Sequence, residues 1–154
     1  MKFRAQRPIR HHAARGFSLV ELLIVCAVIT ILASIAAPNI IRTRISANEA
    51  SAISSLRIIA KGMEGWRIRH PAGYPANFKD LASQIPPEID PNLAQGERSG
   101  YVFSGGGDVN VWHVVAVPVQ VGTTGLRSFY VNEIGAIHVR DDNTPAGPSD
   151  PCIQ

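Results

Sequence analysis

One long apolar segment near the N-terminus limits what this chain can become. It extends from Phe17 to Ile41 and contains a single charged residue, Glu21. Its uncharged part has 20 residues, Leu22–Ile41, of which Thr30, Ser34 and Asn39 are polar. At ~1.5 Å per residue, a helix of this length crosses a hydrocarbon core of about 30 Å. We therefore expect lipid or other helices to cover this segment.

Positive charge is concentrated in front of the apolar segment. The formal net charge of the 154 residues is +3, but five of the 15 basic residues precede residue 17 and no acidic residue does. The rest of the chain has ten basic residues against 12 acidic ones, a net charge of −2. The basic leader predicts that residues 1–16 stay in the cytoplasm. The acidic remainder offers no basic groove, so we expect no specific nucleic-acid site.

Three interpretations of the apolar segment compete. It could be a plain membrane anchor, or a secretory signal peptide cleaved near Ser34-Ile35-Ala36. It could also follow a leader that is cleaved between Gly16 and Phe17. Three features disfavour the signal peptide: Pro38 lies close to the cut, the basic region is long, and Glu21 lies within the apolar segment. Only the third interpretation gives Glu21 a partner.

The partner of Glu21 would come from a second chain. A carboxylate at mid-bilayer costs roughly 2.5–3.5 kcal/mol on insertion scales, and less near the end of the segment. Cleavage after Gly16 would create an α-amine at Phe17. That amine is poorly placed for the Glu21 of its own helix but could pair with Glu21 of a neighbour. These two residues therefore suggest side-by-side assembly.

The sequence Arg15-Gly-Phe-Ser-Leu-Val-Glu-Leu-Leu-Ile-Val25 resembles the prepilin cleavage and methylation motif of type IV pilins and type II secretion pseudopilins. Pro38 matches the proline that interrupts the pilin helix. The resemblance implies that a prepilin peptidase cuts between Gly16 and Phe17 and that Phe17 is N-methylated. It also implies that Glu21 docks against the terminus of a neighbour during filament assembly. The segments Gly122–Val131 and Gly135–Ile137 further resemble the last two strands of pilin-like proteins from environmental Gram-negative bacteria.

Beyond the apolar segment, residues 42–140 are expected to form an α+β globular domain. Apolar residues recur at three- and four-residue steps through 42–70, which predicts an amphipathic helix that is continuous with the first, is kinked near Pro38 and ends before Pro71. Residues 71–99 are rich in Pro and Gly and predict a loop with a helical turn at 77–82. We expect four side chains to anchor this loop, Tyr74, Phe78, Leu81 and Ile85.

A period of two from residue 100 to residue 140 predicts an antiparallel sheet of about four strands. The expected strands are Tyr101–Ser104, Asn110–Pro118, Arg127–Asn132 and Ala136–Arg140. The expected turns are Gly105–Asp108, Gly122–Gly125 and Asn132–Gly135, the last with its glycine at positive φ. The helix should pack on the apolar face of this sheet. Residues 141–154 are rich in Asp, Pro and Gly and are expected to be flexible.

No pattern predicts catalysis, a cofactor or a metal. The glycine-rich segments lack the Gly-Lys-Ser/Thr of a phosphate loop, and His113 and His138 lack a third ligand. His11 and His12 in the leader are incidental, and no acidic loop has calcium-ligand spacing. Cys26 and Cys152 lie too far apart to bridge within one chain, so Cys152 is either free or paired between chains.

Together these features predict a non-enzymatic filament subunit. The precursor would cross the inner membrane once with a cytoplasmic N-terminus, and the mature chain would join a periplasmic or cell-surface filament. Its partners would be further copies and other pilins, prepilin peptidase with its methyltransferase activity, and a pilus or secretion machine. The alternatives are a type II secretion pseudopilin and a membrane-anchored periplasmic binding module that never polymerises.

Overall fold

The computed structural model describes residues 16–142 and 144–153. The basic leader, apart from Gly16, lies outside the described residues. The chain divides into two compact units, Met1–Pro38 and Asn39–Gln154, and both contain part of the helix α1, Leu19–Arg69. The helix ends one residue before the predicted limit because Pro71 disfavours helical backbone at His70. The α+β class is confirmed.

The second unit is built on an antiparallel meander. Its strands follow chain order, β1 (Glu97–Arg98), β2 (Tyr101–Gly107), β3 (Trp112–Pro118), β4 (Ser128–Asn132) and β5 (Ile137–Arg140). The four predicted strands correspond to β2–β5, and the two-residue β1 adds a short edge. The hairpin between β4 and β5 has Gly135 at φ 79°, as its sequence predicted.

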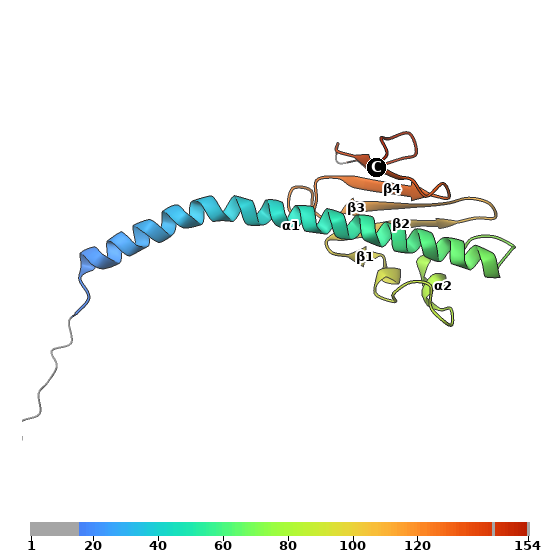
Figure 1. The fold of residues 1–154 in the computed structure, drawn as a ribbon, viewed down its shortest axis with the longest axis horizontal. Coiled ribbons are helices and arrows are strands. Elements are labelled where there is room, and N and C mark those ends of the chain that lie inside the picture. The colour runs from blue at the N-terminus through green and yellow to red at the C-terminus, as the bar shows by residue number, and fades with distance from the viewer. Residues whose placement is uncertain (1–15, 143, 154) are drawn as a thin grey trace, which may run out of the picture. The chain divides into compact units, whose positions relative to one another are not determined.

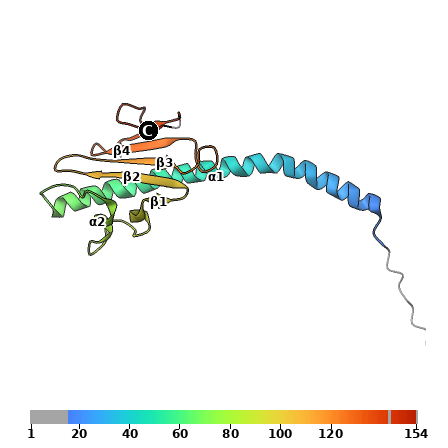
Figure 2. The same cartoon turned by 180° about the vertical axis from the view of Figure 1, so that it is seen from behind.

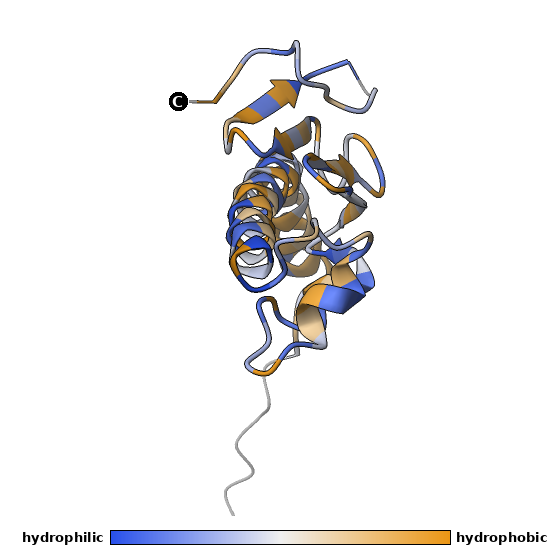
Figure 3. Cartoon of the chain, turned by 90° about the vertical axis from the view of Figure 1, so that its right-hand side faces the viewer, coloured by the Kyte–Doolittle hydropathy of each residue, from blue (hydrophilic) through white to orange (hydrophobic). Residues whose placement is uncertain are grey.

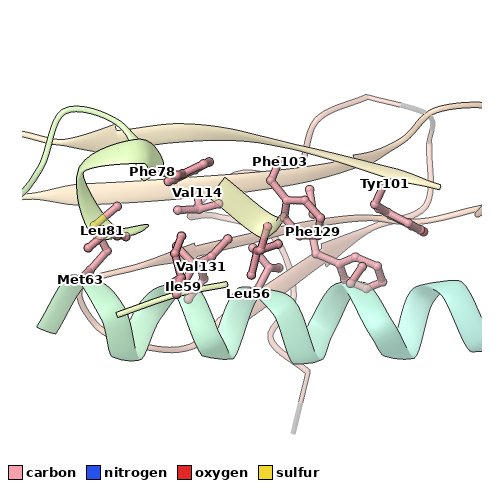
Figure 4. Close-up of a cluster of buried hydrophobic side chains, with 14 of the residues drawn as sticks. Leu56, Ile59, Met63, Phe78, Leu81, Tyr101, Phe103, Val114, Phe129 and Val131 are labelled. Atoms are coloured by element: carbon pink, nitrogen blue, oxygen red, sulfur yellow. The ribbon is translucent and has the colours of Figure 1, made fainter. Parts of the chain in front are cut away.

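The core lies between α1 and one face of the sheet (Figures 1 and 3). The helix contributes Ala52, Leu56, Ile59 and Met63, whose steps of four, three and four residues place them on one face. Alternate residues of the strands face them and are buried, including Tyr101, Phe103, Val114, Phe129 and Val131 (Figure 4). Trp112 of β3 belongs to the same core. The apolar face of the strands, predicted from the period of two, therefore packs on the apolar face of the helix, predicted from the period of 3.6.

The connection between α1 and the sheet runs beside β2 (Figures 1 and 2). It contains α2 (Phe78–Ala82), which corresponds to the predicted helical turn at 77–82, and a 3₁₀ turn at Leu93–Gln95. Phe78 and Leu81 are buried, as expected of loop anchors. Ile85 is 98% exposed, so the prediction that it anchors the loop is wrong.

The predicted turn at Gly105–Asp108 is also wrong, because Gly105–Gly107 continue β2 and pair with β3. Tyr74 N donates to the carbonyl of Asp108, and Gly107 N donates to the carbonyl of Pro75. A Cβ at Gly106 would collide with the backbone of Ala76. These glycines therefore permit the close approach of a neighbouring backbone within a strand.

The segment after β5, expected to be flexible, has defined contacts in the structure. Val139 N donates to Pro151 O, and Ile153 N donates to Ile137 O, so residues 151–153 line the outer edge of β5. Ser128 Oγ of β4 donates to Thr144 O at 2.6 Å. The composition of this C-terminal segment did not predict these contacts.

Candidate functional site: an exposed apolar helix and its acidic start

The first turn of α1 is capped by Glu21. Leu22 N donates to Ser18 O at 3.2 Å, which makes Ser18 the N-cap residue. Glu21 Oε2 accepts a hydrogen bond from Ser18 N at 2.9 Å, the Glu half of a capping box. The sequence argument that only cleavage gives Glu21 a partner is therefore incomplete, since the Ser-x-x-Glu spacing already supplies one.

This hydrogen bond leaves Glu21 able to bind further donors. A carboxylate has about four lone-pair sites on its two oxygens, and one backbone N–H occupies one of them. Glu21 is exposed, and Phe17 is 77% exposed beside it. Both predicted assembly residues thus lie at the open start of the helix.

Every residue from Gly16 to Arg44 is exposed, and Ile45 is the first buried one. Fourteen large apolar side chains are exposed from Phe17 to Ile41, thirteen of them on α1 and Phe17 just before it. Full burial gains about 1.5 kcal/mol or more for each, so leaving them in water would cost about 20 kcal/mol. By length and composition α1 can cross a membrane.

The two hydroxyl side chains of residues 22–41, Thr30 and Ser34, do not oppose transfer into an apolar environment. Thr30 Oγ1 donates to Cys26 O at 2.7 Å, and Ser34 Oγ donates to Thr30 O at 2.8 Å. Each hydroxyl is therefore satisfied inside its own helix. Pro38 lies within α1 and lacks the backbone N–H of a regular turn. The kink expected there remains a prediction.

A buried carboxylate of α1 fixes one connection of the second unit. Glu49 accepts hydrogen bonds from Leu126 N at 3.0 Å and from Arg127 N at 3.2 Å. The guanidinium of Arg127 donates to its other oxygen through Nε at 2.9 Å and Nη2 at 2.7 Å. Asn48 Nδ2 donates to Thr124 O at 2.9 Å. The β3–β4 connection, residues 119–127, is thereby attached to α1.

The sequence held one signal for this ion pair. Glu49 lies four residues after Ile45 and three before Ala52, so it occupies a position of the buried stripe. A charged residue there needs a partner because burial of an unpaired carboxylate is costly. The expectations drawn from the sequence gave Glu49 no role and therefore missed this pair.

A second ion pair fixes the C-terminal segment. Arg140 donates to Asp150 through Nε at 2.9 Å and Nη2 at 2.7 Å, and Gly147 N donates to Asp150 at 2.7 Å. The hydrogen bond from Arg140, followed by that from Gly147, lowers the pKa of the Asp150 carboxyl. His138 Nδ1 lies 2.6 Å from Asp150 O, and Cys152 Sγ lies 3.5 Å from the same nitrogen.

The histidines singled out by sequence lie on the outer face of the sheet. His113 is exposed and stacks on Tyr130, whereas His138 is buried and meets the edge of the same ring. Across residues 16–142 and 144–153, no group of three His, Cys, Asp or Glu side chains is arranged to hold a metal ion.

These features define a class of protein: a small α+β domain that carries a long N-terminal helix, whose exposed apolar part is long enough to cross a membrane. A family model described as the prokaryotic N-terminal methylation motif matches residues 11–37. The chain is 31% identical over 104 residues to the type IV wide pilus major component PilA4 of Thermus thermophilus, covering 64% of this chain and 79% of that protein.

Two other relatives extend the comparison. The type IV major pilin protein PilA of Myxococcus xanthus is 32% identical over 132 residues, 85% of this chain and 56% of that protein. The type II secretion system core protein G of Escherichia coli is 27% identical over 89 residues, 57% of this chain. The chain spans 56% and 61% of the length of these two relatives. It belongs to the family of type IV pilins and type II secretion pseudopilins.

Proposed function

We propose that this chain is a subunit of a type IV pilus or a pilus-like filament, inserted in the inner membrane as a precursor and cleaved between Gly16 and Phe17. A prepilin peptidase would make the cut and methylate the new N-terminus. The head, residues 42–140, would face the periplasm and later the outside of the filament. The chain would have no catalytic activity of its own.

The observation that carries the proposal is the exposed apolar surface of α1 with one carboxylate at its start. Such a surface is covered by lipid before assembly and by the helices of other copies afterwards. Glu21 of one copy would pair with the Phe17 amine of a neighbour and set the register between them. The free acceptor sites of Glu21 support this pairing without loss of the helix cap.

The test combines two measurements on cells that assemble the filament. Mass spectrometry of sheared surface material should find a mature chain that starts at N-methylated Phe17. Glu21→Ala should reduce the filaments recovered at least about tenfold, since removing one partner of a desolvated ion pair costs about 3–5 kcal/mol. Glu133→Ala, which removes an exposed carboxylate of the head, is the matched control and should leave filament yield unchanged.

Other outcomes identify other functions. A chain that starts near Ala37 would be an exported soluble protein, and one with its leader intact would be a plain anchor. Unchanged filament number in Glu21→Ala would refute the assembly mechanism, and improved insertion without any filament would indicate a solitary anchored module.

A type II secretion pseudopilin is the second candidate, because the similarity to the core protein G of E. coli includes 57% of this chain. A methylated Phe17 terminus found only in membranes, with secretion lost in Glu21→Ala, would favour it over a surface pilus.

A further inference from the structure

A groove of about 520 Å³ lies where α1 meets the β3–β4 connection. Ile45 and Leu126 supply its apolar lining, and its charged lining residues are Arg42, Glu49, Arg127 and Asp141. Figures 1 and 2 show the connection beside α1 at the end of the sheet where β3 ends and β4 begins. The head's own core does not fill this groove.

The groove is preformed. Ile45 is buried, and Leu126 is 52% exposed on the surface of the connection. The backbone of Leu126 is fixed because its N–H donates to the buried Glu49. The side chain of Leu126 therefore stays beside α1 with much of its apolar surface uncovered. A rigid apolar surface of this kind binds with little ordering cost.

The charges of the groove balance. Two arginines face two carboxylates, and Arg127 is already engaged by Glu49 through two hydrogen bonds. A balanced lining does not select for a phosphate headgroup or a nucleic acid, which would require an excess of positive charge. The partner that fits is apolar and uncharged.

The chain itself contains such a partner. Leu22–Ile41 is an uncharged helical segment of 20 residues, and all of it is exposed. In sequence, the lining residue Arg42 directly follows Ile41, the last residue of this segment. A cavity of about 150 Å³ accepts one benzene-sized group, so the groove has room for about three aliphatic side chains. Three side chains on one face are what a helix presents to a groove.

We propose that the groove between α1 and the β3–β4 connection receives apolar side chains from Leu22–Ile41 of a second copy of this chain. This inference rests on the proposed function and adds a contact that Glu21 does not make. The head then helps to bury the helix of its neighbour, and the Glu49–Arg127 pair holds the receiving surface in place.

The first test replaces an exposed rim residue and leaves the fold intact. Leu126→Glu keeps the backbone hydrogen bond to Glu49 but places a charge where the neighbour's helix would lie. Filament recovery should fall about tenfold or more. The matched control is Ile134→Glu, which changes an exposed residue in the β4–β5 turn at the opposite end of β4. Filament recovery of the control should stay within about twofold of wild type. Both variants should have the melting temperature of the wild-type chain in detergent.

The second test identifies the occupant. A benzophenone amino acid at position 126 of the full chain is irradiated in filaments assembled from a mixture of isotopically heavy and light subunits. Cross-links between heavy and light chains that map to residues 22–41 support the proposal. Cross-links only to phospholipid, only to residues of another head or only within one chain would overturn it.

The proposed function and the groove contact are refuted by different results. Wild-type chains that form no filament at all refute the proposed function, and with it the groove's occupant. Wild-type filaments that are unaffected by Leu126→Glu refute the groove contact and leave the proposed function intact.

Discussion

Glu49→Ala should destabilise the head more than any other single loss of charge in the α1–sheet interface. Glu49 is buried, and its two oxygens accept four hydrogen bonds from the β3–β4 connection. The methyl group of alanine leaves those donors without an acceptor. The connection should then detach from α1, while the central strands stay paired.

The magnitude follows from the separate donors. Leu126 N and Arg127 N each lose a hydrogen bond at a partly buried position, at a cost of about 1 kcal/mol each. The guanidinium of Arg127 is 42% exposed, so its ion pair contributes no more than about 1 kcal/mol after screening by water. The free energy of unfolding should fall by about 3 kcal/mol, and the melting temperature by about 10 °C.

The assay is unfolding of the full chain in a mild detergent, followed by tryptophan fluorescence, to which Trp112 of β3, buried in the core, contributes. Arg127→Ala should cost about 2 kcal/mol, because the two backbone hydrogen bonds to Glu49 remain but its other oxygen is left buried without a donor. Glu133→Ala controls for the loss of one negative charge and should have no measurable effect. If Glu49→Ala were as stable as Glu133→Ala, the argument that this carboxylate holds the connection would be refuted.

Two further predictions test the packing of β2 and the C-terminal contact. Gly106→Ala should lower the free energy of unfolding by about 2 kcal/mol in urea denaturation, because its methyl group displaces residues 74–76, whereas Gly147→Ala should match wild type; equal stability of the two would contradict the close approach. Asp150→Asn tests pH dependence: because the pKa of Asp150 is lowered on folding, its contribution to stability is present above the usual value of 3.8 and is lost as the pH falls through the lowered pKa. The melting temperatures of wild type and Asp150→Asn should therefore differ near neutral pH and converge in acid, and a constant difference would contradict the ion pair with Arg140.

Local patterns predicted the helix and the strands because each depends on neighbours in sequence. The helical period ended at Pro71, and α1 ends at Arg69. Trp112, Val114 and Ala116 alternate along β3, and all three are buried. Backbone geometry repeats every 3.6 or two residues, so the buried face of each element is written in its own sequence.

The same local reasoning failed where a distant segment decided the outcome. Three consecutive glycines indicate a turn when read alone. In the structure they continue β2, and their lack of side chains lets the backbone of residues 74–76 approach the strand closely. The Asp-, Pro- and Gly-rich end of the chain indicates mobility when read alone, yet Arg140 and Asp150 hold it against β5. Composition limits the conformations that a segment can adopt, and contacts with a distant segment determine which of them it adopts.

The sequence by itself determined that this protein carries a helix whose apolar surface is unfavourable in water. It also determined the cleavage motif and the single carboxylate at the start of that helix. Those properties depend on apolar length, charge order and residue spacing, which exist before folding. Only the tertiary structure decided that Glu49 would hold Arg127, 78 residues away, so that both residues line one groove. That pairing requires the chain to return to α1 after three strands, and no local pattern specifies where the return occurs.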